Sequence, residues 1–218
     1  MDQPEHINTQ GTGSDTASVE PPRRSPWSKK ALLIRIIWGV CETLLWRPSP
    51  VWAWGFRASL LRLFGAKIGR GVRIHPSVKV IIPWHLHIRD GVRVHERAIL
   101  YALGEIDIGE DSVVGPLAHL CAGTHDFTDP AFTLLCQPII IGKRCVLGAG
   151  CFVAPNITLA DDTILMPRSA MYAQSEPGTC YQGNPAKLFA PGPAALSITN
   201  EVAPDPESNS ESKRGVQG

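Results

Sequence analysis

The sequence has almost no net charge and few aromatic residues. Its 21 Lys and Arg residues nearly balance its 20 Asp and Glu residues, which leaves a formal charge of +1. No strong field of one sign is present to recruit nucleic acid, and we expect no nucleic-acid partner. Aromatic residues make up 7% of the 218 residues, whereas Gly and Pro number 20 and 19. This composition favours a chain with many turns over a helical bundle.

The sequence also lacks the patterns that mark disulfide frameworks, zinc sites and protein export. Its six Cys residues never show CxxC spacing, which argues against a zinc site or a disulfide framework. Reduced cysteines in a cytosolic protein are the simpler interpretation. The first 26 residues are polar and contain no apolar core of the signal-peptide type. We therefore expect no cleavable signal peptide.

The composition divides the chain into four segments. Residues 1–27 and 190–218 are rich in Pro, Ser, Glu and other small or polar residues. Such segments bury too little apolar surface to offset the entropy lost on ordering, so we expect disordered tails. Residues 28–66 have the pattern of amphipathic helices, and residues 67–189 carry a regular repeat. We expect the repeat to form the body of the protein.

The helical segment, residues 28–66, is basic and rich in Trp. Its apolar run, residues 31–45, is interrupted by Arg35 and Glu42, so it is too short for a membrane-spanning helix. We expect the helices to form a cap on the repeat. The alternative is that residues 28–64 lie on a membrane surface, where Trp and basic side chains are favoured. The expected location is the cytoplasm, and in the alternative the inner face of the membrane.

Aliphatic residues recur at every sixth position through residues 67–189. Neither the helix period of 3.6 residues nor the strand period of 2 explains this spacing. A short period maintained over roughly a hundred residues predicts a parallel β-helix. Three hexads then form one triangular coil, with the aliphatic anchors inside and small residues at the corners, and we expect about five coils. The anchors are Ile68, Ile74, Val80, Leu86, Ile88, Val94, Leu100, Ile108, Val114, Leu120, Ile141, Leu147, Val153, Leu159, Leu165 and Met171.

The repeat is interrupted by a polar loop. The hexads stop after Leu120 and resume at Ile141, and the segment Thr124–Pro130 lies between them. Smaller irregularities are a phase shift of two residues between Leu86 and Ile88 and a connector at residues 101–107. A strict repeat broken by one His-bearing loop indicates a rigid scaffold that positions a functional loop.

Several segments resemble the hexapeptide-repeat acyltransferases, and in particular the colanic acid biosynthesis, nodulation and maltose acetyltransferases. The resemblance covers residues 28–189. It implies an all-β fold, a left-handed parallel β-helix, and assembly as a homotrimer with active sites between subunits. The matching segments are Leu60–Gly69, Pro83-Trp84, Leu100–Gly109, Leu120–Asp126, Pro138–Gly142 and Gly183–Lys187.

The resemblance implies acetyl transfer from acetyl-CoA to a hydroxyl of a saccharide in exopolysaccharide biosynthesis, on a free or lipid-linked acceptor. A hydroxyl is a weak nucleophile that needs a general base, and the pKa of His suits this task. His125 matches the catalytic His of the family. Asp126 matches the Asp of the family's His-Asp pair, and it would orient the imidazole, cap the loop or bind the acceptor. No metal is expected.

Three further residues match coenzyme-binding positions of the family. The coil near Gly148 and Ala149 corresponds to the family's CoA channel, and its amides are candidate donors to the tetrahedral intermediate. Lys187 matches a basic position near the nucleotide phosphates. Other positions depart from the family pattern, and these departures bear on CoA binding and on acceptor specificity. These are Val146 in place of Trp, Met166-Pro167 in place of Gly-Ala, Ala173 in place of Lys, and Ala102 near a usual Asn.

Three other interpretations are open on the residues alone. A non-catalytic scaffold or assembly subunit would explain the altered coenzyme positions. A Cys–His acyl-enzyme would use Cys121, four residues before His125, although a buried Cys at a repeat corner is the commoner case. A β-helix of the γ-carbonic anhydrase type would need three His ligands for zinc, and the spacing of the His residues does not match that pattern.

Overall fold

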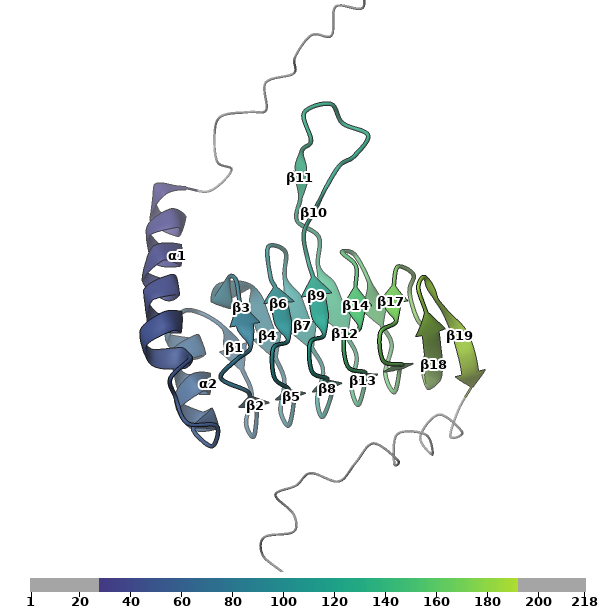
Figure 1. Ribbon diagram of the computed structural model, residues 1–218, viewed down its shortest axis with the longest axis horizontal. Helices are drawn as coiled ribbons and strands as arrows, with labels where there is room; N and C mark the ends of the chain where they lie inside the picture. Colours follow the sequence, from purple (N-terminus) through teal and green to yellow (C-terminus); the bar gives the residue numbers. More distant parts are fainter. Residues whose placement is uncertain (1–27, 192–218) are drawn as a thin grey trace, which may run out of the picture.

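The computed structural model describes residues 28–191. They form a parallel β-helix with two helices at its N-terminal end (Figure 1). This confirms the expected all-β repeat fold. The predicted disordered tails, residues 1–27 and 190–218, lie outside the described residues except for the last two residues of the final strand.

The two helices precede the repeat. α1 comprises Lys29–Cys41 and continues as a π-helical turn over Glu42–Trp46, and α2 comprises Trp54–Leu63. The side chain of Ser28 caps α1 by accepting a hydrogen bond of 3.2 Å from the amide of Ala31. No described helix is long and apolar enough to cross a membrane.

Nineteen short strands lie within residues 67–191, and all of them except β10 and β11 belong to the three sheets that form the faces of a triangular prism. Face A consists of β1, β4, β7, β12 and β15, and face C of β3, β6, β9, β14 and β17. Face B consists of β2, β5, β8, β13, β16 and β18, and β19 pairs antiparallel with β18 at its edge. The described residues therefore form five complete coils and the start of a sixth, as the hexads predict. The strands are β1 (Lys67–Ile68), β2 (Arg73–Ile74), β3 (Lys79–Val80), β4 (Leu86–Ile88), β5 (Arg93–Val94), β6 (Ile99–Tyr101), β7 (Ile106–Ile108), β8 (Val113–Val114), β9 (His119–Cys121), β10 (Thr124–His125), β11 (Leu134–Leu135), β12 (Ile139–Ile141), β13 (Val146–Leu147), β14 (Phe152–Val153), β15 (Thr158–Leu159), β16 (Ile164–Leu165), β17 (Ala170–Met171), β18 (Thr179–Gly183) and β19 (Ala186–Pro191).

The first coils are longer than the later ones. Lys67 pairs with His87, twenty positions on, whereas Ile140 pairs with Thr158, eighteen positions on. The two extra residues lie at the corner between faces C and A, which a 3-10 turn over Pro83–His85 occupies in the first coil. The phase shift in the hexads is therefore a wider corner, and the strands on either side keep their register.

The aliphatic anchors stack on one another to form a single core along the prism axis. Ile88, Ile108 and Ile141 are paired in register on neighbouring strands of face A, and all three are buried. Each coil adds another layer of such side chains, so apolar burial grows in proportion to the number of coils. The resulting scaffold is rigid because every strand of the three faces is hydrogen-bonded to a strand of the coil before it, of the coil after it, or of both.

A buried arginine attaches the helices to the first coil. The guanidinium of Arg57 in α2 donates to the carbonyl oxygens of Ile74 at 2.7 Å, Pro50 at 2.7 Å and Val51 at 2.5 Å, and to the hydroxyl of Ser49 at 2.9 Å. Ile74 belongs to β2, while the other three acceptors lie in the connection between the helices. This arrangement fixes α2 against the prism, and desolvation lowers the pKa of Arg57.

Candidate active site

The loop that interrupts the repeat leaves the prism between β9 and β12, at the corner between faces C and A. Its strands β10 and β11 pair antiparallel, so that Thr124 lies opposite Leu135 and His125 opposite Leu134. The resulting hairpin projects well beyond the coils (Figure 1). The repeat is therefore interrupted by an ordered element that carries His125.

The base of the hairpin is packed against the corner of the preceding coil. The amide of Gly104 donates to the carbonyl of Ala122 at 2.8 Å. A Cβ atom on Gly104 would lie 2.5 Å from the carbonyl oxygen of Gln137, which lies between β11 and β12 on the other side of the hairpin base. A Cβ atom on Gly123 would likewise lie 2.8 Å from Leu103. Only glycine permits this close approach, so the rigid coil determines where the hairpin begins.

The imidazole of His125 is held by Phe132, on the opposite side of the hairpin. Nδ1 lies 2.7 Å from the carbonyl oxygen of Phe132, and the two rings stack with centroids 4.5 Å apart and an interplanar angle of 11°. A carbonyl oxygen only accepts hydrogen bonds, so Nδ1 carries the proton in this contact. Nε2 is then the basic nitrogen of the neutral ring. Such a ring accepts a proton at a defined atom.

The carboxylate of Asp126 is bonded within the turn of the hairpin. It accepts hydrogen bonds from the hydroxyl of Thr128 at 2.6 Å and from the amide of Thr128 at 2.9 Å. These bonds lower the pKa of Asp126. The group bonded to Nδ1 of His125 is thus the carbonyl of Phe132, and the carboxylate of Asp126 shapes the turn.

The structure places the two predicted coenzyme residues Gly148 and Ala149 on another edge of the prism. They lie at the corner between faces B and C, just after β13, and face C separates them from the hairpin of the same chain. The amide of Gly148 donates to the carbonyl of Leu165 at 2.7 Å, so it is already used within the β-helix. Within one chain the structure therefore does not bring His125 together with these residues.

Two exposed cations lie at or beyond this corner. Arg168 sits in the next coil, where its amide donates to the carbonyl of Ala149 at 2.8 Å, and its side chain is exposed. Lys187, which the sequence singled out, is exposed on β19 beside face B. Sequence reasoning missed Arg168, because only the register of the coils reveals that it lies beneath Ala149.

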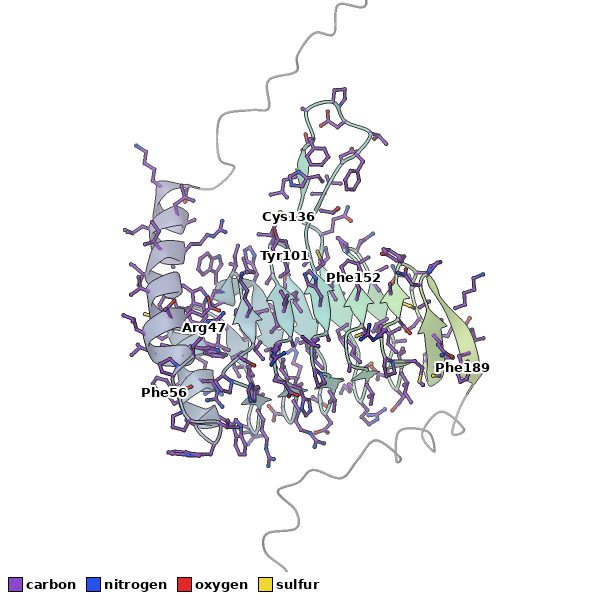
Figure 2. The ribbon with its side chains drawn as sticks, viewed as in Figure 1. Arg47, Phe56, Tyr101, Cys136, Phe152 and Phe189 are labelled. Atoms are coloured by element: carbon purple, nitrogen blue, oxygen red, sulfur yellow. The ribbon has the colours of Figure 1, made fainter. Side chains whose placement is uncertain are left out.

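A row of rings runs along the outside of face C. Ring centroids are 6.0 Å apart for Tyr101 and His119, 5.5 Å for His119 and Phe152, and 5.8 Å for Phe152 and Tyr172. Figure 2 shows Tyr101 and Phe152 on the side of the prism from which the hairpin projects. Nε2 of His119 is buried without a hydrogen-bond partner among the described residues, and burial lowers its pKa. Sequence reasoning did not single out this row.

The structure also places the other residues that the sequence raised. Burial raises the pKa of the Cys121 thiol, whose Sγ donates to the carbonyl of Gly123 at 3.2 Å. Ala102 is buried, and its carbonyl contacts Nδ1 of His85 at 3.0 Å. Pro167 packs against Gly148 from the next coil. Among residues 28–191, no group of three or more His, Cys, Asp or Glu side chains is arranged to hold a metal ion.

No protein-family model matches the chain. The chain is 42% identical over 160 residues to WcaF of Escherichia coli strain K12, a protein assigned as an acetyltransferase of colanic acid biosynthesis. The alignment covers 73% of this chain and 87% of WcaF. Identity at this level, over most of both chains, places them in one family.

Two solved structures share the fold. A maltose O-acetyltransferase from Clostridium difficile 630 superposes with a TM-score of 0.70 at 17% identity, covering 76% of this chain and 90% of that one. A hexapeptide-repeat acetyltransferase from Vibrio cholerae, solved in complex with acetyl-CoA, gives a TM-score of 0.69 at 19% identity and covers 75% and 90%. The resemblance seen in the sequence is confirmed: the chain belongs to the hexapeptide-repeat acetyltransferase family that includes WcaF.

Proposed function

We propose that the protein transfers an acetyl group from acetyl-CoA to a hydroxyl of a saccharide, with His125 as the general base. The observation that carries this proposal is the contact of 2.7 Å between Nδ1 of His125 and the carbonyl of Phe132. It favours the tautomer in which Nε2 accepts a proton, and it would stabilise the imidazolium that forms. Acyl transfer to a weakly nucleophilic hydroxyl requires a general base, and His125 is carried by a hairpin that is fixed to the rigid coil.

The proton transfer would run through one atom. Nε2 of His125 takes the proton from the acceptor hydroxyl as the hydroxyl oxygen bonds to the thioester carbonyl carbon. The carbon–sulfur bond then breaks, and the imidazolium returns the proton to the departing thiolate. The products are an acetyl ester and CoA. The amide of Gly148 is already bonded, so the amide of Ala149 is the better candidate for a donor to the developing oxyanion.

The corner between faces B and C supports acetyl-CoA as the acyl donor. Gly148, Ala149 and Gly150 leave only small side chains there, which allows a pantetheine arm to approach the backbone. Arg168 lies directly beneath Ala149, and Lys187 lies farther along the prism, so exposed cations are present for phosphate groups.

A saccharide acceptor is supported by the relatives and by the hairpin. WcaF is assigned to colanic acid biosynthesis, and a structural neighbour is a maltose O-acetyltransferase. At the hairpin tip Phe127 is 78% exposed, and its ring lies 5.4 Å from that of Phe132. Exposed aromatic rings next to a base provide the apolar surface on which the C–H face of a sugar ring packs. An exopolysaccharide unit or its lipid-linked precursor fits this surface.

A complete site requires a second copy of the chain. His125 stands at the corner between faces C and A, whereas Ala149 stands at the corner between faces B and C. A neighbouring subunit that presents its own corner to the hairpin would join the base to the coenzyme. We therefore include in the proposal a homotrimer with sites between subunits.

The base assignment is tested by His125→Gln. With acetyl-CoA and saccharide acceptors, CoA release should fall by about two to four orders of magnitude, because the amide accepts no proton at neutral pH. The matched control is His87→Gln on face A, where the new amide can keep the contact with Glu105. Undiminished turnover in His125→Gln would overturn the assignment. Failure of the parent protein to bind acetyl-CoA in calorimetric titration would favour the scaffold interpretation instead.

The role of Asp126 is tested by two substitutions. Asp126→Asn keeps an oxygen that accepts the two hydrogen bonds from Thr128, whereas Asp126→Ala removes both. If Asp126 acts by shaping the turn, the Asn variant should keep most of kcat and the Ala variant should lose more. Equal, large losses in both variants would show that the carboxylate charge itself acts on His125.

A further inference from the structure

The side of α1 that faces away from the prism is apolar, although the exposed side of a surface helix is ordinarily polar. Ile36 in α1 and Leu44 in the following turn are 65% and 66% exposed. We call this surface the outer face of α1. Its exposed apolar side chains are Leu32, Leu33, Ile36, Ile37, Val40 and Leu44. They recur at helical spacing, so they form one continuous strip.

The opposite side of α1 is fully engaged with the protein. Trp38 is buried, and its indole nitrogen donates to the carbonyl of Val80 in β3 at 2.8 Å. Its ring also makes edge contacts with Trp46 and Phe64, with centroids 6.0 and 5.1 Å apart. These contacts fix the rotation of α1, so the outer face is held outward by specific packing.

Two further apolar features lie at the helical end of the molecule (Figure 1). In and beside α2, Trp52 is 75% exposed and Phe56 and Leu63 are also exposed; Figure 2 shows Phe56 at the end of the molecule where the helices lie. A groove of about 480 Å³ lies between α1 and the first coil, and it shares Ile37 with the outer face. It is lined mainly by Lys30, Ile34, Ile37, Leu63, Phe64 and Trp84. The apolar surface is therefore larger than one helix face.

The charges around this surface have one sign. Residues 28–66 contain six basic residues and one acidic residue, and Arg57 is the one basic residue among them that is buried, against the first coil. The acidic residue is Glu42, which is largely buried and pairs with Arg47 at 3.4 Å. Lys29 and Lys30 are exposed at the first turn of α1. An apolar strip with cations at one end is suited to a lipid bilayer, in which negatively charged headgroups cover an apolar layer.

We propose that the outer face of α1 lies in the plane of a bilayer that contains anionic lipids. The 13 residues of α1 span roughly 20 Å, which suits a helix lying parallel to the bilayer plane. Side chains such as Ile36 enter the acyl region, Trp52 takes the interfacial position that Trp favours, and Lys29 and Lys30 reach lipid phosphates. A second copy of the chain would bring the same positive charge to this surface, whereas anionic lipid brings the opposite charge.

The experiment is sedimentation of the full chain with phosphatidylcholine vesicles, with and without phosphatidylglycerol. No substrate is present, so the result is independent of the acetyl-transfer proposal. The parent protein should pellet with the anionic vesicles. The double variant Ile36→Glu/Val40→Glu should bind at least about tenfold more weakly, because two charges enter the strip. The matched control is Leu188→Glu, at a 57% exposed apolar position on β19, and it should bind like the parent.

The basic residues are tested separately. Lys29→Ala/Lys30→Ala should reduce the preference for anionic over neutral vesicles and weaken the dependence of binding on salt. The proposal is overturned if the parent stays in the supernatant with both vesicle types, or if the Ile36→Glu/Val40→Glu variant binds like the parent. A second measurement identifies the other occupant of this surface. If the parent binds no vesicles and the Ile36→Glu/Val40→Glu variant has a lower molecular mass than the parent in light scattering, the outer face contacts a second copy of the chain and the proposal is overturned. Circular dichroism verifies that every variant is folded.

Discussion

A methyl group added at Gly104 tests whether the position of the hairpin controls catalysis. The new Cβ would lie 2.5 Å from the carbonyl oxygen of Gln137 and 2.8 Å from that of Ala122. Ordinary contacts begin near 3.4 Å, so the base of the hairpin must move by roughly 1 Å. A misplacement of that size costs about a hundredfold in rate when it shifts a catalytic group. We expect Gly104→Ala to lower kcat by about that factor.

Gly109→Ala provides the matched control. A Cβ atom on Gly109 would lie 2.5 Å from the carbonyl carbon and oxygen of Gly142 and 2.7 Å from the amide of Lys143. The clash is as severe as at Gly104, but it lies at the corner between faces A and B, away from the hairpin. Both variants should lose about 1 to 3 kcal/mol of unfolding free energy. Only Gly104→Ala should lose kcat.

The two variants are compared by urea unfolding and by CoA release at a temperature where both are folded. Circular dichroism and light scattering establish that each keeps its fold and molecular mass. If both variants are destabilised and both keep the parent kcat, the position of the hairpin does not limit catalysis and the reasoning is refuted. Equal loss of kcat in both would assign the effect to the scaffold as a whole.

Three other perturbations test the packing of the scaffold. Arg57→Ala should cost about 3 to 5 kcal/mol of unfolding free energy in urea, because buried carbonyls lose their charged donor, and Arg57→Lys should recover only part of it. Burial raises the pKa of Cys145 to about 11 and of Cys151 to about 12, so in the folded protein both should resist a disulfide reagent that modifies exposed Cys136. Burial lowers the pKa of His119 below 6.5, so the unfolded chain takes up the proton first and stability falls as the pH drops below that value. His119→Phe should keep the ring row and reduce the difference in thermal stability between about pH 8 and about pH 5.5.

The coils were predictable because one aliphatic residue in six is enough to define them. Each anchor must face the axis, so the hexads specify the strands, their order and the number of coils. The interruption of the repeat likewise marks the position of the hairpin. The wider corners after Val80 and Leu100 appear in the sequence only as a shift of phase, because a corner of any length leaves the strands in register.

The partner of His125 was not predictable from the sequence. The match to the family's His-Asp pair suggested Asp126, but neighbouring residues in an extended chain point to opposite sides. The carbonyl that accepts the hydrogen bond from Nδ1 belongs to Phe132, which the antiparallel hairpin brings back from seven residues away.

The reason for the glycine at position 148 was also not predictable from the sequence. The structure gives it a packing reason, since the backbone of Pro167 would lie 2.5 Å from a Cβ atom there. A close approach by coenzyme is therefore not needed to explain this glycine.

The separation of His125 and Ala149 on two edges of the prism leads to a test in mixtures. If each site joins the hairpin of one subunit to the corner of its neighbour, His125→Gln and Ala149→Trp should each be inactive alone. When the two chains are co-expressed and assemble at random, about a quarter of the parent activity should return. Each interface has an intact His125 with a probability of about one half and an intact Ala149 with a probability of about one half, so about one interface in four has both. A site formed within one chain would show no recovery. Activity near zero in the mixture would therefore contradict the shared site while leaving His125 as the base.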